Sequence, residues 1–486
     1  MPSGPRSLQS DLVVVGAGGA GLFTALTAAA QGAAVTLISA TPLAQTASYW
    51  AQGGLAAALA DDDSPDLHRA DTEKAGRGAV RISAATQLCR EAPGIVRELE
   101  GLGVRFDVGA DGQLALGLEG GHSRRRVVHA GGSATGRRVV RTLSALVVER
   151  PQITVIERAR VCAVWTYSGR AVGVVLEDGR TVQSRATVLA TGGMAAMWSR
   201  TTNPPGSQGF GAMLAGGAGA DLADLEFMQF HPTAVTGVPG REGFLVTEAI
   251  RGEGATLHDT TGERFVDELA PRDEVSRAIW KVMQEQHTDR VMLDMRNVDP
   301  DVFPNVVGAL RDSGLDPATE LVPVSPASHY GMGGVRCDLE GGTTVPGLYA
   351  VGETACTGLH GANRLASNSL SECFVQGKRA ALAGLTEPPV AGETDAPPTA
   401  EPLIPPSAET RDALWKLAGL ERTGAELERL CEDPHPLARA IATSALARTE
   451  SRGAHQRKDF PETDRNFDGM HAVVSDDNVP RFEQWT

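Results

Sequence analysis

The feature that most constrains the fold is a glycine-rich turn near the start of the chain. An apolar run, Leu12-Val13-Val14-Val15, leads into Gly16-Ala17-Gly18-Gly19-Ala20-Gly21, and residues 22–26 continue with helical character. Valines before glycines are typical of a buried parallel strand. The first glycine permits a tight turn, the second lets backbone approach a pyrophosphate, and the third lets the helix pack on the strand. Such a pattern can be an ordinary glycine turn, but its place between strand and helix predicts nucleotide binding.

The expected nucleotide is not an ordinary NAD. A second apolar run, residues 34–38, follows at the spacing of a βαβ unit. Ser39-Ala40 then stand where an acidic residue would hold the ribose hydroxyls of NAD. The strand, turn and helix therefore predict a dinucleotide site that lacks the NAD acid.

Composition limits the partners and the compartment. The chain has 486 residues and a formal net charge of −15, which argues against a nucleic-acid partner. Its six cysteines form no C-x-x-C pair, so we expect reduced thiols, no metal site and a cytoplasmic location. Residues 1–10 lack the apolar core of a signal peptide, and no apolar run of about 18 residues predicts a membrane span.

Charged stretches between residues 60 and 130 need an interpretation. Asp61, Asp62, Asp63 and Asp66 resemble a metal site at first sight, but such a run is more often a solvated acidic loop. The three arginines at residues 124–126 are likewise interpreted as a solvated face. Glu119 is different, because an acid beside two glycines and a histidine is a less common combination.

The chain changes character twice. Residues 1–225 carry the glycine turn and strand patterns over 153–156, 171–176 and 186–190. Residues 226–336 differ, and there Pro271 is expected to open a helix with acids in its first turn. Residues 337–385 return to a strand that ends in Gly352-Glu353. We therefore predict an α+β domain inserted into a nucleotide-binding domain.

The segments from residue 369 to the end of the chain are predicted to be a helix, a linker and a second helical region. Ser369 is placed to cap a helix that runs to about residue 385. Residues 386–406 are rich in proline and lack a periodic apolar pattern, which predicts a linker. Residues 407–449 have helical periodicity, and 457–486 are expected to be a polar tail, so 407–486 form a C-terminal helical region with a tail.

Five motifs carry a family resemblance. They are Ala51-Gln52-Gly53-Gly54, Gln229-Phe230-His231-Pro232-Thr233, Arg251-Gly252-Glu253-Gly254, Leu269-Ala270-Pro271-Arg272-Asp273 and His360-Gly361-Ala362-Asn363-Arg364. With them the chain resembles the L-aspartate oxidase branch of the succinate dehydrogenase/fumarate reductase flavoprotein family, from about residue 11 to 385 and again over 450–462. The resemblance implies an α/β fold: a Rossmann-like FAD-binding domain with an inserted α+β capping domain and a C-terminal helical region.

The resemblance also implies FAD as the cofactor, which fits the missing NAD acid. Residues 17–20 would hold the pyrophosphate, 47–54 would wrap the flavin, Glu353 would meet the ribityl chain, and residues 369–370 would offer backbone N–H groups to the ring. Ala47 stands where succinate dehydrogenases bond the flavin covalently through a histidine, so noncovalent FAD is expected. Gln208 replaces an aspartate of relatives. The expected cofactor residues are Gly16, Ala17, Gly18, Gly19, Ala20, Gly21, Ser39, Ala47, Ser48, Tyr49, Trp50, Ala51, Gln52, Gly53, Gly54, Val161, Thr191, Gly192, Gln208, Glu353, Ser369 and Leu370.

The resemblance assigns a second set of residues to the substrate and the reaction. Arg272 matches a proton-transferring arginine, and Glu119 matches the acid that orients a substrate ammonium. A dicarboxylate needs cationic clamps, for which arginine offers a planar fork, and up to four positive groups are expected in one pocket. The expected catalytic and substrate residues are Arg272, Glu119, His231, His329, Arg364, Thr247, Glu248 and Arg251.

The implied reaction is FAD-dependent oxidation of L-aspartate to iminoaspartate, with hydride transfer from Cα to flavin N5. Electrons would pass to O₂, giving peroxide, or to fumarate. The family's place in NAD synthesis implies the first step of that pathway, with a quinolinate synthase as partner. Two alternatives stay open: a fumarate reductase or succinate dehydrogenase flavoprotein subunit, and a non-catalytic flavin-binding sensor.

Overall fold

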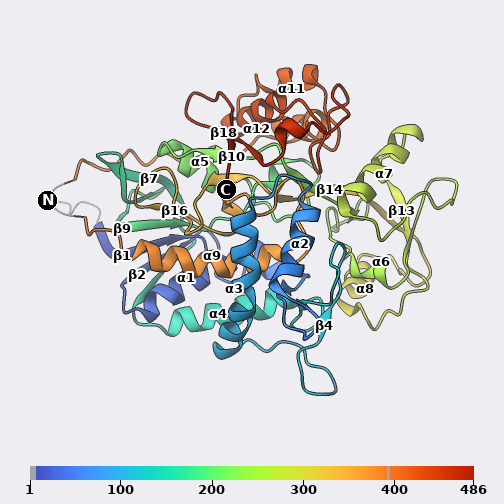
Figure 1. Ribbon diagram of the computed structural model, residues 1–486, viewed down its shortest axis with the longest axis horizontal. Helices are drawn as coiled ribbons and strands as arrows, with labels where there is room; N and C mark the ends of the chain where they lie inside the picture. The colour runs from blue at the N-terminus through green and yellow to red at the C-terminus, as the bar shows by residue number, and fades with distance from the viewer. Residues whose placement is uncertain (1–6, 391–393) are drawn as a thin grey trace.

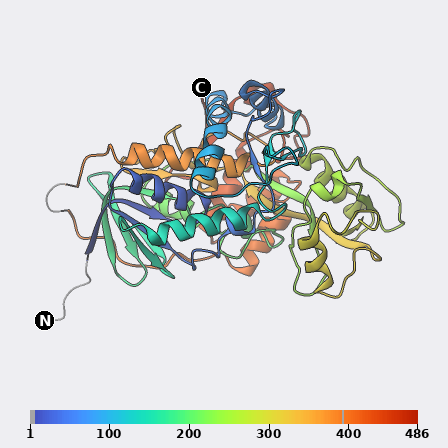
Figure 2. The ribbon, with the colours of Figure 1, turned by 90° about the horizontal axis from the view of Figure 1, so that it is seen from below.

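The computed structural model describes residues 7–390 and 394–486, which form an elongated molecule (Figure 1, Figure 2). A seven-stranded sheet dominates one end. Strands β6, β2, β1, β9 and β16 run parallel, whereas β7, β8 and β9 form an antiparallel meander. In spatial order the strands are β6 (Ile153–Glu157), β2 (Val35–Ser39), β1 (Ser7–Val15), β9 (Thr181–Leu189), β8 (Arg170–Leu176) and β7 (Val161–Tyr167), with β16 (Leu348–Ala350) also paired to β9.

Strand β1 is buried on both faces, which explains its unbroken apolar run. Leu12 and Val14 belong to one hydrophobic cluster, and Val13 and Val15 belong to another on the opposite face. Successive side chains of a strand point to opposite faces, so a strand covered on both sides has no polar positions to alternate with. The expected nucleotide-binding strand is confirmed.

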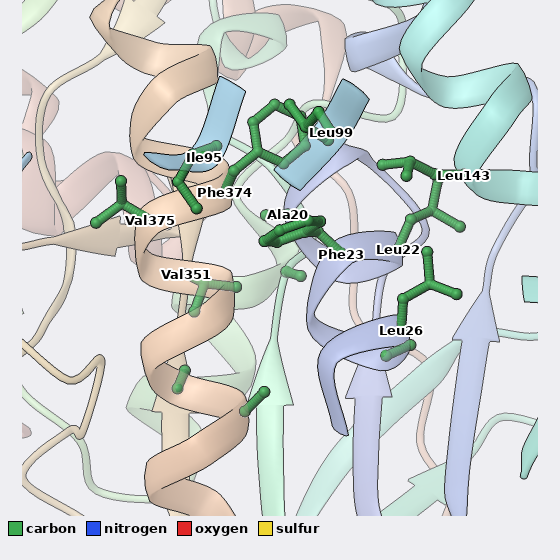
Figure 3. Packing of buried hydrophobic residues seen from close by; sticks show 14 of the residues in the cluster. Ala20, Leu22, Phe23, Leu26, Ile95, Leu99, Leu143, Val351, Phe374 and Val375 are labelled. Atoms are coloured by element: carbon green, nitrogen blue, oxygen red, sulfur yellow. The ribbon is translucent and has the colours of Figure 1, made fainter. Parts of the chain in front are cut away.

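Helices cover one face of this sheet. Helices α1 (Gly19–Ala30) and α9 (Asn368–Gly384) lie side by side, with α4 (Thr135–Glu149) against α1 and α3 (Ile82–Gly101) against α9 (Figure 1). Phe23 of α1 meets Phe374 of α9 edge to face, with ring centroids 5.4 Å apart (Figure 3). Helices α1 and α9, which lie more than 300 residues apart in the chain, therefore share one core. The opposite face of the sheet packs against α5 (Phe210–Gly217).

The glycine turn joins β1 to α1 by close backbone contacts. Gly16 has φ +110°, and a Cβ built there would lie 2.2 Å from the carbonyl oxygen of Ala190. A Cβ at Gly21 would lie 1.9 Å from the carbonyl oxygen of Gly16. Side chains are therefore excluded at both positions, as the motif predicts.

Residues 228–331 form a second body at the other end of the molecule (Figure 2). Its core contains Val246, Leu257 and Ile279 and draws only on residues of this segment. Pro271 precedes α7, whose first turn carries Asp273 and Glu274 as expected. The body consists of a sheet in the order β11 (Met228–Val235), β14 (Val322–Gly331), β13 (Val291–Asp294) and β12 (Thr256–His258), with helices α6 (Ala249–Gly252), α7 (Arg272–Glu285) and α8 (Pro304–Arg311).

The smaller elements complete the first body. Helix α2 (Pro65–Ala75) packs on α3. A three-stranded sheet has the order β3 (Leu55–Ala56), β5 (Val127–Val128) and β4 (Leu116–Gly117). The 3₁₀ turns are η1 (Ala47–Trp50), η2 (Ala195–Met197), η3 (Gly352–Thr354) and η4 (Arg465–Phe467).

The C-terminal region contains the expected helices but no loose tail. Helices α10 (Ala408–Leu417), α11 (Gly424–Leu430) and α12 (Pro436–Ala447) confirm the helical periodicity. The prediction of a polar tail over 457–486 is wrong, because buried Ala472, Val473 and Val474 bring that segment into a sheet. The sheet has the order β17 (Ala355–Cys356), β15 (Gly334–Arg336), β10 (Leu222–Ala223), β18 (Met470–Val474) and β19 (Arg481–Gln484).

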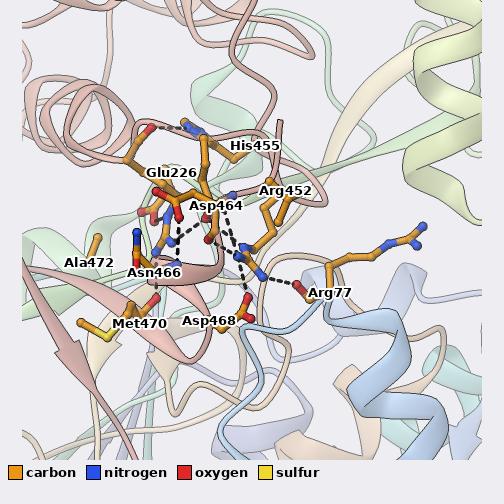
Figure 4. A network of polar contacts seen from close by, with 12 residues as sticks. Arg77, Glu226, Arg452, His455, Asp464, Asn466, Asp468, Met470 and Ala472 are labelled. Atoms are coloured by element: carbon orange, nitrogen blue, oxygen red, sulfur yellow. Dashed lines mark hydrogen bonds and ion pairs between the residues drawn. The ribbon is translucent and has the colours of Figure 1, made fainter. Parts of the chain in front are cut away.

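Buried ion pairs lie where this region meets the first body, and the pair of Arg448 with Glu226 joins the two (Figure 4). Arg448 Nε donates to Glu226 Oε1 at 2.7 Å, and Arg452 Nε donates to Glu450 Oε1 at 2.8 Å. All four side chains are at most 2% exposed, so each charge depends on its partner in place of water. The charged residues Arg448, Glu450 and Arg452, which precede the segment 457–486, are therefore interior.

Two further surface predictions are corrected. Arg126 is fully buried and pairs with Asp63 at 2.8 Å and with Asp71 at 2.6 Å. The run 124–126 is thus a solvated face only at Arg124 and Arg125, and Asp63 is not part of a solvated loop. Burial of Arg126 required two carboxylates from distant positions, and the local sequence does not show such a pairing.

Three observations concern other parts of the chain. Residues 391–393 of the expected linker lie outside the described residues, and 394–406 have no helix or strand. All six cysteines are free. In the described ranges no helix is both long and apolar enough to cross a membrane.

Gly21→Ala is expected to destabilise the protein, because its methyl group would overlap the Gly16 carbonyl and push α1 off β1. The loss should be about 3 kcal/mol in the free energy of unfolding. Gly94→Ala is the matched control, because Gly94 lies in α3 with open space around its Cα. That change should stabilise the helix by about 0.5–1 kcal/mol. Chemical unfolding followed by circular dichroism measures both, and equal stabilities would contradict the close contact.

Candidate active site

The residues expected at the cofactor lie at one edge of the large sheet. Gly16 follows β1, Ser39 ends β2, Thr191 follows β9 and Glu353 follows β16. These four strands are parallel neighbours, so their carboxyl ends meet at that edge. Open parallel sheets bind ligands outside the carboxyl ends of their strands.

The backbone at this edge fits a pyrophosphate. Among the described residues no side chain caps α1, and the Gly19 N–H donates only to Ser48 Oγ, at 3.1 Å. A helix N-terminus with free N–H groups attracts anions. A Cβ at Gly193 would lie 2.1 Å from Glu353 Oε1, so the glycine admits that carboxyl group. Residues 16–21 and 191–193 therefore offer the glycine-lined surface that FAD requires.

The N-terminus of helix α9 lacks the expected serine cap. Ser369 is inside the helix, and its Oγ accepts from Arg364 Nη1 at 3.2 Å. Ser367 occupies the cap position in a left-handed conformation, φ +60°, and its side chain does not cap either. The expectation that Ser369 caps α9 is wrong, because arginine and glutamate side chains engage these hydroxyls.

The other expected cofactor residues surround this edge. In residues 47–54, the Gly54 N–H donates to Ser367 Oγ at 3.2 Å, Gln52 Nε2 donates to the Leu245 carbonyl at 3.3 Å, and Trp50 is 61% exposed. Gln208 is next to Gly209, whose N–H donates to the Gly193 carbonyl at 3.1 Å. Val161 lies in the apolar cluster behind the sheet.

Two guanidinium groups meet at one amide oxygen. Arg272 Nη1 and Arg364 Nη2 both donate to Gln229 Oε1, at 3.4 and 3.1 Å. Gln229 Nε2 in turn donates to Asn363 Oδ1 and to the Arg364 carbonyl, both at 2.9 Å. Arg272 begins α7, whereas Arg364 precedes α9, so the glutamine joins the two bodies of the molecule.

Arg364 is held over an aromatic ring. Its guanidinium carbon lies 4.6 Å from the ring centre of Tyr330, and its Nε has no hydrogen-bond partner within the described residues. Burial, together with the charge of Arg272, lowers the pKa of Arg364 to about 10. The Tyr330 hydroxyl donates to Glu372 at 3.2 Å, beside His360 at 2.8 Å from the same oxygen. An unsatisfied donor on a buried cation favours an anionic ligand.

The two site histidines lie together and are neutral. The rings of His231 in β11 and His329 in β14 are 5.2 Å apart. Burial and the nearby Arg272 hold the pKa of each ring well below its usual value. The expectation of four positive groups is therefore corrected to two arginines and two neutral rings. His231 Nδ1 accepts the Thr233 N–H at 3.2 Å, so its proton is on Nε2, which has no partner among the described residues.

Glu248 and Arg251 belong to the same cluster of side chains around Arg272. Arg272 Nε donates to Glu248 Oε2 at 2.6 Å, and Arg251 Nη2 is 3.9 Å from that oxygen. Burial opposes the charge of Glu248, but the two arginines lower its pKa. Arg251 also donates to the Glu268 carbonyl, whereas Thr247 is half-buried just before α6.

Glu119 is the second acid of the pocket. Ser367 Oγ donates to its Oε2 at 2.6 Å, and His129 Nε2 is 3.4 Å from its Oε1. Burial alone would raise the pKa, but these hydrogen bonds and the charges of His129 and Arg272 lower the pKa of Glu119 to about 2. The carboxylate is therefore ionised at neutral pH.

Sequence reasoning missed two members of this site. Gln229 was quoted only as part of a motif, although its position two residues before His231 in one strand was a usable signal. Ser367 lies outside the five motifs that carry the family resemblance. Its contact with Glu119, 248 residues away in sequence, has no local signature.

Comparison with known proteins agrees with this geometry. The family model "FAD binding domain" matches residues 11–370, and "Fumarate reductase flavoprotein C-term" matches 431–484. An L-aspartate oxidase of Nostoc is 49% identical over 78% of this chain and 68% of its own length, and one of Streptomyces coelicolor is 41% identical over 97% and 92%. The solved structure of a quinol fumarate reductase from E. coli superimposes with a TM-score of 0.87 at 28% identity, over 98% of this chain and 96% of that chain.

These matches cover most of the chain and include the segments that build the site. The cofactor of this enzyme is FAD. The chain belongs to the L-aspartate oxidase family, FAD-dependent oxidoreductases with the fold of succinate dehydrogenase and fumarate reductase flavoproteins.

Proposed function

We propose that this protein oxidises L-aspartate to iminoaspartate. The observation that carries the proposal is the ionised Glu119 in the same pocket as Arg272 and Arg364. Aspartate carries two carboxylates and one ammonium. The site offers both signs of charge, with Arg251, Arg272 and Arg364 as cations and Glu119 and Glu248 as anions. The names of the relatives support the same substrate.

Each side chain has a role in this proposal. Arg364 and Arg272 bind the two carboxylates, because a guanidinium offers parallel donors to a carboxylate. His231 and His329, being neutral, add single donors without adding charge. Gln229 spaces the two arginines, and its oxygen stabilises both guanidinium groups until substrate carboxylates take over part of that contact.

Oxidation removes a hydride from Cα and a proton from nitrogen as the C=N bond forms. When bound, FAD supplies the acceptor for the hydride, and O₂ or fumarate then takes the two electrons. Glu119 is a weak base because its pKa is about 2. We therefore assign Glu119 to orientation of the ammonium, and the proton lost from nitrogen passes to water. A guanidinium is also a poor base, so Arg272 stabilises charge or relays a proton.

The same proposal includes a place in a reaction sequence. An imine hydrolyses in water, so a quinolinate-forming enzyme that consumes iminoaspartate early in NAD synthesis is the expected partner. The likeness to a fumarate reductase supports fumarate as one acceptor.

A fumarate reductase or succinate dehydrogenase flavoprotein subunit is the competing function. Succinate has no ammonium and gains nothing from an ionised Glu119. A sensor without catalysis fits poorly with relatives named as oxidases.

Anaerobic addition of L-aspartate to the holoenzyme is expected to bleach the flavin absorbance, whereas succinate should not. Glu119→Gln should lower the rate of bleaching by aspartate about 100-fold, because an ionic hydrogen bond is lost. Fumarate reduction by the chemically reduced variant should change little and serves as the control. Equal bleaching by succinate in the wild type would favour the competing function.

Glu353 gives a pH prediction for the protein without FAD. Burial raises the pKa of Glu353 to about 7, although the Gly331 N–H donates to it at 3.0 Å. A raised pKa means that the folded state binds the proton more tightly than the unfolded state. Its stabilising effect is therefore complete below the unfolded pKa and is lost as the pH rises through about 7.

Glu353→Gln keeps the acceptor but cannot ionise. Between about pH 5 and pH 7.5, the wild-type apoprotein should lose about 2–3 kcal/mol of stability relative to this variant. Urea unfolding of both proteins at the two pH values measures the difference. Parallel pH profiles would show that Glu353 has an ordinary pKa.

A further inference from the structure

The short segment between α2 and α3, residues 76–81, is held tightly by the first body. The Ala362 N–H donates to the Gly76 carbonyl at 3.1 Å, and the Gly469 N–H donates to the Gly78 carbonyl at 2.8 Å. The Arg81 N–H donates to the Gly358 carbonyl at 2.8 Å. The loop over residues 358–362 and Gly469 of the C-terminal region therefore fix this backbone.

Arg77 is fixed most firmly of all. Arg452 Nη1 donates to the Arg77 carbonyl at 2.6 Å, as Figure 4 shows, and Arg452 itself pairs with buried Glu450 and with Asp468. The backbone of Arg77 is left-handed, φ +55°. Its guanidinium therefore extends from a backbone position that these contacts hold in place.

That guanidinium contacts the second body at the first turn of α7. Arg77 Nη2 lies 3.1 Å from Asp273 Oδ2 and 2.8 Å from Glu274 Oε1. The Asp273 side chain is only 5% exposed, whereas that of Arg77 is 33% exposed. Asp273 is thus desolvated and depends on Arg77, yet salt in the solvent can reach the pair.

The position of this turn controls the pocket. Arg272 is the residue next to Asp273, and its guanidinium must reach both Glu248 and Gln229. Later in α7, Trp280 Nε1 donates to Glu421 at 3.2 Å, and the Trp280 ring lies 5.8 Å from that of Trp415. Helix α7 is therefore attached to the rest of the molecule at its first turn and again at Trp280, and Arg77 is the attachment next to Arg272.

We propose that Arg77 is a positioning residue for Arg272: it docks the first turn of α7 on the first body and so sets the place of the Arg272 guanidinium. The catalytic consequence rests on the proposed oxidation of aspartate. Arg77 touches neither Gln229 nor Glu248 and acts through the helix alone. A misplacement of about 1 Å at a reacting group can cost as much as 100-fold in rate.

The test compares Arg77→Ala with Arg77→Lys and with Arg97→Ala in the FAD-loaded enzyme. Arg97 is an exposed arginine of α3, so its removal controls for net charge. Hydrogen exchange of the peptide that covers 272–285 is measured together with kcat and KM for L-aspartate. We expect Arg77→Ala to raise exchange in that peptide and to lower kcat/KM about tenfold. Arg77→Lys should restore most of both, and Arg97→Ala should match the wild type.

A double variant tests the contact itself. Arg77→Ala leaves Asp273 desolvated and unpaired, so Arg77→Ala with Asp273→Asn should cost no more than Arg77→Ala alone. Unchanged hydrogen exchange of α7 in Arg77→Ala would overturn the proposal. A loss of protection from exchange that is equal in all peptides would also overturn it. If the wild type failed to oxidise aspartate while α7 exchange still rose in Arg77→Ala, the proposed function would fail but the docking contact would stand.

Discussion

The contact between Gly21 and the Gly16 carbonyl is the constraint on which the site depends. It lets α1 lie against β1, and α1 then packs on α9 through Phe23 and Phe374. Helix α9 follows the loop that carries Arg364 and Ser367. A side chain at Gly21 would separate these layers, so backbone packing at the turn places residues that lie about 350 positions later.

The site combines like charges that would repel one another with buried acids that would not stay ionised without neighbouring cations. Arg272 and Arg364 tolerate each other because one neutral oxygen, that of Gln229, accepts from both. Burial and the neighbouring arginines together lower the pKa of both histidines, so the rings are neutral. Hydrogen bonds and the same positive charges keep Glu119 and Glu248 ionised. Such a site is arranged for a ligand of mixed charge, and its donors come from both bodies of the molecule. Contacts that hold the two bodies together are therefore part of the chemistry.

Local patterns predicted well where one element contains the whole signal. The valine run, the glycine turn, the acids after Pro271 and the periodicity of the C-terminal helices each depend on neighbours in sequence. The wrong predictions concern residues whose contacts are distant in sequence. Arg126 and Asp63 appear solvated because of their polarity, but they bury each other as an ion pair. Within the segment 457–486, residues 471–474 are buried because their strand pairs with β10, more than 200 positions earlier in the chain.

By itself the sequence determined the βαβ unit, the missing NAD acid and the residue types that a charged substrate requires, since spacing and chemistry are properties of the chain. Only the tertiary structure decided which of those residues meet. It showed Gln229 between two arginines, Ser367 against Glu119, and Arg77 against the helix that begins with Arg272. Protonation also belongs to the folded state, because burial and the surrounding charges set each pKa, and both arise when distant segments pack together.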